Sequence, residues 1–187
     1  MLGFDENGLL PVGVHDCDEG EFRTLLVDSF PDSATRGVIA AGFARLRIDA
    51  CDHALAGMHW IDGSYVTNKQ NPNDIDVVTF VDVDLLESLL GSPGEQFVIQ
   101  VLAGGPATPA VYRSDSYVVA VAPPDHPEHH RFVKARDYWR KWFGHMRTVG
   151  GPDGALLPAR PKGILQMQLG DPLKQPQIES WGDITNG

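Results

Sequence analysis

The sequence predicts an α/β (α+β) protein, because segments with the pattern of β-strands alternate with segments that have the period of α-helices. Apolar, β-branched and aromatic residues mark the strand-like segments, which are residues 57–62, 74–81, 111–121 and 162–169. The helical segments are residues 18–30, 34–56 and 128–143. A length of 187 residues with 42% hydrophobic residues suits one domain with a buried core.

The N-terminal part of the chain predicts an extended arm followed by two helices. Residues 1–16 contain glycine, proline and aspartate among a few apolar positions, and we expect them to lie as an arm on the body of the domain. Asp18 is expected to cap the helix 18–30. Ser33 is expected to cap the helix 34–56, whose apolar residues at helical spacing predict a buried face made of Val38, Ile39, Phe43, Leu46 and Ala50.

The helix 34–56 also carries three arginines, for which two interpretations are open. Arg36 or Arg45 could bind a phosphate group, or these side chains and that of Arg47 could be solvated on the outer face of the helix. We favour the solvated interpretation, since exposed arginines on helices are common.

Two aspartates follow a glycine–serine pair in the middle of the chain. Asp74 and Asp76 stand two residues apart at the start of a predicted strand, so both side chains should project from the same face. Neighbouring carboxylates suit hard cations such as Mg²⁺. Gly63 allows the backbone to approach a ligand closely, and Ser64 can begin a helix whose N–H groups bind phosphate. A phosphate site beside a metal-binding carboxylate pair is the requirement of nucleotide chemistry.

Two nearby residues have two interpretations each. Lys69 lies in the turn between the strands and could either contact a phosphate or face solvent. Asp62 could either point into the site or serve as a turn or capping residue.

The segments after the second strand predict a mixture of helix, loop and strand. Asp84 is expected to cap a helix at residues 85–90. Residues 95–103 are compatible with helix or strand, and residues 104–109 predict a flexible loop at the edge of the nucleotide cleft. Residues 148–161 predict a loop or lid, because glycines and prolines are frequent there.

The remaining elements predict an outer layer and a sheet edge. The helix 128–143 contains five aromatic rings, most of which we expect in the core, with one exposed ring able to stack on a base: Phe132, Tyr138, Trp139, Trp142 and Phe143. The alternating strand 162–169 is expected at the sheet edge. Residues 171–187 are expected to form a loosely ordered tail.

The central motif resembles the signature of the polymerase-beta-like nucleotidyltransferase superfamily. That signature is an apolar residue, Gly-Ser or Gly-Gly, roughly ten residues, and then acid-apolar-acid; here nine residues separate Gly63-Ser64 from Asp74-Ile75-Asp76. Nearly the whole chain is similar to a narrower family of small bacterial and phage proteins within the superfamily. That similarity rests on Leu9-Leu10-Pro11-Val12-Gly13-Val14-His15, on Asp62-Gly63-Ser64-Tyr65-Val66-Thr67, on Tyr138-Trp139, on Trp142-Phe143-Gly144 and on Pro161-Lys162-Gly163-Ile164.

The resemblance implies a nucleotidyltransferase fold, a mixed sheet flanked by helices, over residues 1–170. It implies a third acid on a strand next to the acid pair, and Asp115 is the carboxylate of the segment 111–121. Asp74, Asp76 and Asp115 would then be the catalytic and metal-binding residues for Mg²⁺ or Mn²⁺, with Gly63, Ser64 and Lys69 as nucleotide-binding residues. The implied reaction transfers a nucleoside monophosphate from a nucleoside triphosphate such as ATP to a hydroxyl group.

The acceptor stays open among a partner protein, an RNA 3′ end and a small molecule, and the resemblance implies a toxin–antitoxin or phage-defence setting. A rival interpretation is a non-catalytic module that binds nucleotide or a partner protein. A metal-dependent phosphohydrolase also uses paired aspartates, but it leaves Gly63-Ser64 unexplained.

Charge and hydropathy limit the partners. The net charge of −10 disfavours general DNA binding, although eight of the 15 Lys and Arg residues fall between positions 131 and 162. That basic region could serve a triphosphate or an RNA end, or it could be a solvated helix face. No apolar run is long enough to cross a membrane, and the N-terminus lacks the basic start of a signal peptide. We therefore expect a cytoplasmic protein.

Overall fold

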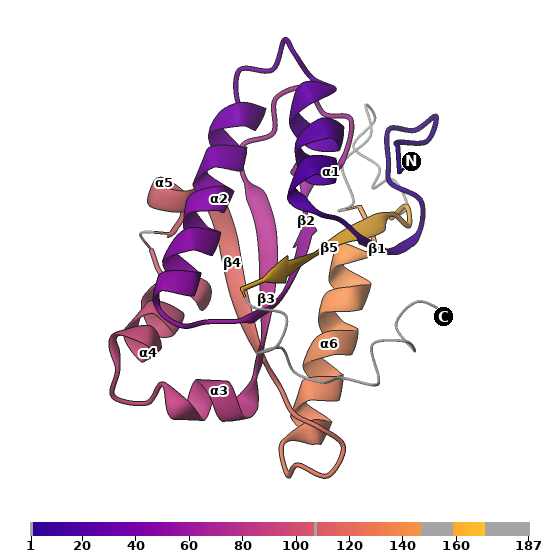
Figure 1. Ribbon diagram of the computed structural model, residues 1–187. Coiled ribbons are helices and arrows are strands. Elements are labelled where there is room, and N and C mark those ends of the chain that lie inside the picture. Colours follow the sequence, from indigo (N-terminus) through magenta and orange to yellow (C-terminus); the bar gives the residue numbers. More distant parts are fainter. Residues whose placement is uncertain (1, 107, 147–158, 171–187) are drawn as a thin grey trace.

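The computed structural model describes residues 2–106, 108–146 and 159–170, and it contains a five-stranded sheet in the order β1-β5-β2-β3-β4 (Figure 1). The strands are β1 (Gly13–Asp16), β2 (Gly57–Asp62), β3 (Ile75–Asp82), β4 (Ser114–Val121) and β5 (Gly163–Leu169). β2 is antiparallel to both β3 and β5, whereas β1 is parallel to β5 and β3 is parallel to β4. The predicted α+β class with a mixed sheet is therefore confirmed.

Helices surround this sheet and connect its strands. They are α1 (Glu19–Arg23), α2 (Arg36–Asp52), α3 (Val83–Ser88), α4 (Pro93–Phe97), α5 (Thr108–Tyr112) and α6 (His129–Phe143). Short turns of π-helix extend α1 over Thr24–Asp28 and α4 over Val98–Leu102, and a 3₁₀ turn spans Ser64–Val66. Every helix in the described ranges is too short or too polar to cross a lipid bilayer.

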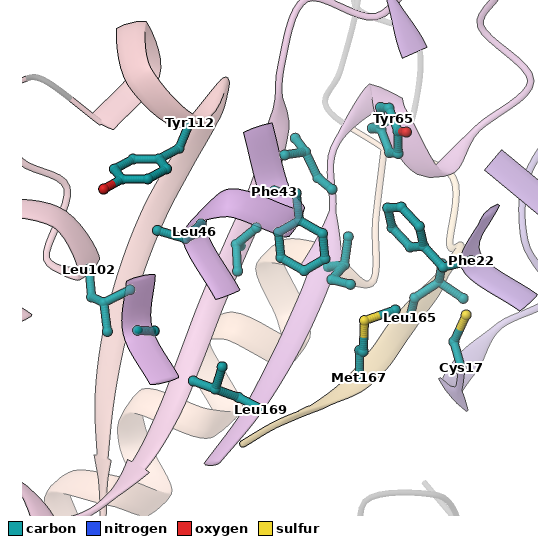
Figure 2. Close-up of a cluster of buried hydrophobic side chains, with 14 of the residues drawn as sticks. Cys17, Phe22, Phe43, Leu46, Tyr65, Leu102, Tyr112, Leu165, Met167 and Leu169 are labelled. Carbon is teal, nitrogen blue, oxygen red and sulfur yellow. The ribbon is translucent and has the colours of Figure 1, made fainter. Parts of the chain in front are cut away.

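The two faces of the sheet support two hydrophobic clusters, because successive strand residues point to opposite faces. On one face, α1 and α2 pack Phe22, Phe43 and Leu46 against strand residues such as Val77 and Leu165 (Figure 2). On the other face, α6 contributes residues to a cluster made of Trp60, Val78, Phe80, Val83, Val119, Val121, Ala122, Phe132, Phe143 and Ile164. The sheet is thus held between α2 and α6 (Figure 1).

The first two helices match their predicted positions with local corrections. Asp18 caps α1, since its side chain accepts a hydrogen bond from the Glu21 N–H in a capping box. α2 begins later and ends earlier than predicted, and the Ser33 hydroxyl accepts from the Arg36 N–H just before its first turn. The predicted buried face of α2 is correct except for Val38, which is 54% exposed.

Other predictions about the elements need correction. Asp82, not Asp84, caps α3, because the Asp82 carboxylate accepts from the backbone N–H groups of residues 84 and 85. Residues 93–102 resolve as helical turns, and residues 111–112 end α5 instead of beginning a strand. β5 lies between β1 and β2, so the expectation that it forms a sheet edge is wrong. Most of the predicted lid and the whole tail lie outside the described residues.

The rings of α6 are divided between core and surface. Phe132 and Phe143 are buried as expected, while Tyr138 is 55% and Trp142 is 50% exposed. Two rings of α6 are therefore exposed, whereas one was expected from the sequence.

Candidate active site

A cavity of about 390 Å³ lies at the end of the β2–β3 hairpin and contains most of the predicted site. Its described lining residues come from the N-terminal arm, the hairpin, the end of α6 and the residue before β5: Asn7, Leu9, Asp62, Gly63, Ser64, Thr67, Asn68, Lys69, Asp74, Asp76, Trp142, His145, Met146 and Lys162. A larger cavity of about 760 Å³ between α1 and α2 is lined by none of the predicted site residues. We therefore take the smaller cavity as the candidate site.

Gly63 is required where the chain leaves β2. Its φ of 83° lies in the left-handed region, which disfavours residues with a Cβ. A Cβ at this position would also overlap Oδ2 of Asp76. The close approach seen here is between the Gly63 backbone and the Asp76 carboxylate, and the predicted approach of this backbone to a ligand stays a prediction.

Three aspartates stand in register across neighbouring strands. Asp62 of β2 pairs with Asp76 of β3, and Asp76 pairs with Asp115 of β4. Residues paired in this way share a face of the sheet, and neighbouring strands lie about 4.8 Å apart. Asp74 precedes β3 by one residue and lines the cavity with Asp76. The hairpin thus delivers both predicted carboxylates to one space.

Asp115 of β4 lies next to Asp76 but is not among the described residues that line the cavity. It lies on the same face of the sheet as Asp76. In the described ranges, no three His, Cys, Asp or Glu side chains form a group that could hold a metal ion. The role of Asp115 as third metal ligand stays a prediction.

The cavity also contains a buried ion pair that sequence reasoning missed. Lys162, the residue before β5, donates from Nζ to Oδ1 of Asp62, and both side chains are at most 6% exposed. Burial raises the pKa of Asp62 to about 7, the Lys162 charge opposes this rise, and the nearby Asp76 adds to it. Asp62 also lines the cavity, which agrees with the interpretation that it points into the site.

Lys162 reaches the cavity through pairing that is remote in sequence. β5 pairs with β2 so that Leu165 lies opposite Ile61. The Lys162 N–H donates to the carbonyl of Gly144 at 2.9 Å, which ties the start of β5 to the end of α6. The available sequence signal was a lysine placed directly before an apolar strand.

The side chain of Arg36 holds the loop 64–69, which follows Gly63. This arginine is fully buried, and its guanidinium donates to the carbonyls of Tyr65 at 2.9 Å, Thr67 at 2.6 Å and Lys69 at 2.8 Å. In return the Tyr65 hydroxyl donates to the Arg36 carbonyl at 3.0 Å. Both earlier interpretations of Arg36, as a phosphate ligand and as a solvated side chain, are wrong, because its donors satisfy loop carbonyls.

Arg45 behaves as the sequence predicted. Its side chain is 67% exposed and pairs with Asp49 at 2.7 Å, one helical turn away. The third arginine, Arg47, is mostly covered and contacts Glu19 and the carbonyl of Gln168.

Ser64 and Lys69 lie at the cavity wall with different surroundings. Ser64 begins a single 3₁₀ turn instead of a longer helix, and its carbonyl accepts from the Thr67 hydroxyl at 2.8 Å. One short turn offers fewer aligned N–H groups than the helix that the sequence predicted. Lys69 is exposed, and its backbone is hydrogen-bonded to the side chains of Arg36 and Thr67.

The chain belongs to the family described as "Family of unknown function (DUF6932)", whose model matches residues 2–168. No curated protein matches the chain, and no solved structure matches it.

Proposed function

We propose that the protein is a metal-dependent nucleotidyltransferase, which transfers a nucleoside monophosphate from a nucleoside triphosphate to a hydroxyl acceptor. The observation that supports this proposal is the meeting of Gly63, Ser64, Asp74 and Asp76 in one cavity. These are the residues in which the sequence resembles the polymerase-beta-like superfamily. The nucleotidyltransferase fold and the cytoplasmic location belong to the same proposal.

The donor set in the cavity fits Mg²⁺. Magnesium in nucleotide enzymes is held by one or two carboxylates together with waters and substrate phosphates. Asp74 and Asp76 supply two carboxylates that line one space, and these residues would hold the ion. When bound, Mg²⁺ or Mn²⁺ supplies neutralisation of charge on the phosphates.

The protein's own residues account for the rest of the proposed reaction. The exposed ammonium of Lys69 pairs with the outer phosphates, and Lys162 adds a second positive charge beside them. The acceptor oxygen forms a bond to the α-phosphorus while the bond to pyrophosphate breaks in line. Rigid placement of the loop by Arg36 keeps these groups in position.

Two carboxylates are candidates to accept the proton of the acceptor hydroxyl. Asp115 is the one implied by the resemblance. Asp62 lines the cavity, and its pKa of about 7 matches that of a general base at neutral pH. Asp62→Asn and Asp115→Asn separate them, because only loss of the base removes the acidic limb of the pH–rate profile.

The proposal is tested by incubating the full-length protein with Mg²⁺ and each α-labelled nucleoside triphosphate, with cell extract as the source of acceptors. Pyrophosphate release and label transfer are measured. We expect Asp74→Asn and Asp76→Asn to lose about 100-fold or more of the rate. The matched control is Asp84→Asn, an exposed acid of a second acid-x-acid sequence whose side chain does not cap α3. Equal transfer by all four proteins excludes the mechanism.

A second function is supported by the position of Asp115. Because the described cavity lining includes Asp74 and Asp76 without it, the site suits nucleotide binding that does not proceed to transfer. Calorimetric binding of a triphosphate with no pyrophosphate release with any acceptor selects this non-catalytic module.

A further inference from the structure

The exposed side of α6 carries basic and aromatic residues in one stripe. Successive helix residues are 100° apart, so positions separated by three, four, seven and eleven residues share a face. This spacing places on one side Arg131, Lys134, Tyr138, Lys141 and Trp142, and His145 follows directly after the C-cap residue Gly144. All six are exposed, whereas Phe132 and Phe143 on the opposite side are buried. We call this set of six residues the α6 stripe.

Two rings of the α6 stripe form a stacked pair at the surface. Tyr138 and Trp142 have ring centroids 6.1 Å apart and planes inclined by only 11°. Among the described residues, the other large hydrophobic side chains with comparable exposure are aliphatic: Val12, Val38, Ile48, Leu90, Ile99 and Val111. A stacked, half-exposed pair of rings presents the kind of surface on which a planar base packs.

Charge on the α6 stripe is opposite to that of the whole protein. The chain carries a net charge of −10, yet Lys134 and Lys141 stand on the same face of the helix as the two rings. The acids nearby are paired with arginines, since Asp137 contacts Arg136 at 2.8 Å and Glu128 contacts Arg131 at 2.7 Å. The two lysines thus provide local positive charge for an anionic chain.

The α6 stripe leads into the candidate site. Trp142 and His145 line the same cavity as Asp74 and Asp76. From Arg131 to Trp142 the helical part of the stripe extends about 16 Å at 1.5 Å per residue, which is enough length for a few nucleotides. A polymer on this face therefore has one end at the paired carboxylates.

We propose that the α6 stripe binds single-stranded RNA and directs its 3′ hydroxyl into the cavity as the acceptor. The acceptor role rests on the proposed function, whereas the binding does not. Proteins that hold single strands combine positive charge for the backbone with aromatic rings for the bases. An RNA end presents unpaired bases for stacking. An acidic peptide would use the lysines but leave the stacked rings without a role.

The binding is tested by fluorescence anisotropy with a 5′-labelled single-stranded RNA about 12 nucleotides long, which is within the site sizes of such proteins. We expect Trp142→Ala to weaken binding about 5- to 150-fold, the loss of one stacked base, and Trp142→Phe to retain most of it. Log affinity falls linearly as log salt concentration rises, and Lys134→Ala/Lys141→Ala should make this negative slope less steep by about 1.4. Arg23→Ala/Arg45→Ala removes the same charge from exposed positions on α1 and α2 and should leave the slope unchanged.

Unchanged RNA affinity in Trp142→Ala, or an equal response of the two double variants, overturns the proposal. Tighter binding of single-stranded DNA of the same sequence overturns the choice of RNA. Binding of an acidic peptide that persists when Trp142 is removed assigns the surface to a protein partner instead.

One further variant separates this inference from the proposed function. Asp74→Asn should bind RNA with wild-type affinity while losing nucleotidyl transfer. Transfer by the wild type to a protein, with no RNA binding, overturns the inference and leaves the function standing. RNA binding that depends on Trp142, with no pyrophosphate release, supports RNA binding by the α6 stripe and overturns the proposed function.

Discussion

The ion pair between Lys162 and Asp62 predicts a specific pattern of stability losses. Both side chains are at most 6% exposed, so removal of one leaves the other charged group buried and without its partner. Breaking a buried pair from one side costs about 3–5 kcal/mol, whereas replacing both members with neutral groups is often close to neutral. We expect Lys162→Met and Asp62→Asn each to lose about 3–5 kcal/mol of unfolding free energy, and the double variant to lose far less than the sum.

The same pair predicts how this loss depends on pH. Burial raises the pKa of Asp62 from 3.8 to about 7, and Lys162 opposes the rise. Without Lys162, the folded protein retains the Asp62 proton to still higher pH, while the unfolded chain releases it near its ordinary value. A folded state that binds more protons than the unfolded state loses stability as pH increases. Lys162→Met should therefore cost more at about pH 8 than at about pH 5.

Urea unfolding followed by tryptophan fluorescence measures these free energies, with the four proteins forming a double-mutant cycle. The matched control is the exposed pair of Arg23 and Asp28, whose side chains are 73% and 52% accessible. The same cycle there should give a coupling energy below about 1 kcal/mol. Single variants at Lys162 and Asp62 that stay within about 1 kcal/mol of wild type, or a double variant whose loss equals the sum, would refute the reasoning.

Two further predictions concern buried polar groups around the site. Arg36→Met leaves the carbonyls of Tyr65, Thr67 and Lys69 without the donors of the guanidinium, so it should lower the unfolding free energy by at least about 3 kcal/mol. It should also make the loop 64–69 susceptible to limited proteolysis. An Arg36→Met variant that resists protease as well as wild type contradicts the role assigned to Arg36. His59 is fully buried against Phe43, and burial lowers its pKa to about 3. Below about pH 6.5 only the unfolded chain gains the His59 proton, so the unfolding free energy of wild type should fall by up to about 1.4 kcal/mol per pH unit relative to His59→Phe as pH falls toward 4. Curves of unfolding free energy against pH that are parallel for the two proteins contradict this prediction.

The part of the site that sequence reasoning found is local in the chain. Gly63, Ser64, Asp74 and Asp76 belong to one hairpin, and antiparallel pairing of β2 with β3 brings them together without help from remote segments. The expectation that Asp74 and Asp76 share a side came from alternation along a strand, and both residues line the cavity although Asp74 precedes β3. The strands 57–62 and 74–81 and the helix 128–143 were predictable for the same reason, since each has a strong internal period.

The parts that sequence reasoning missed are long-range and polar. The burial of Lys162 and Arg36 was not predicted, because charged residues are rarely buried without partners and the partners of these two lie far away in the chain. β5 was assigned to the edge because β1, at Gly13–Asp16, is too short and polar to be recognised as its outer neighbour. The adjacent apolar pair Ile164 and Leu165, buried on opposite faces, was the available signal for an interior strand.

The position of the ion pair connects stability with the proposed chemistry. A buried pair of charges contributes little more to stability than apolar side chains of similar size. Lys162 and Asp62 are nevertheless buried at the wall of the cavity that contains Asp74 and Asp76. If Lys162 and Asp62 serve to interact with a substrate, the double variant Asp62→Asn/Lys162→Met should fold nearly as well as wild type and yet lose nucleotidyl transfer. A folded double variant with full transfer activity would show that the reaction does not use the charges of Asp62 and Lys162.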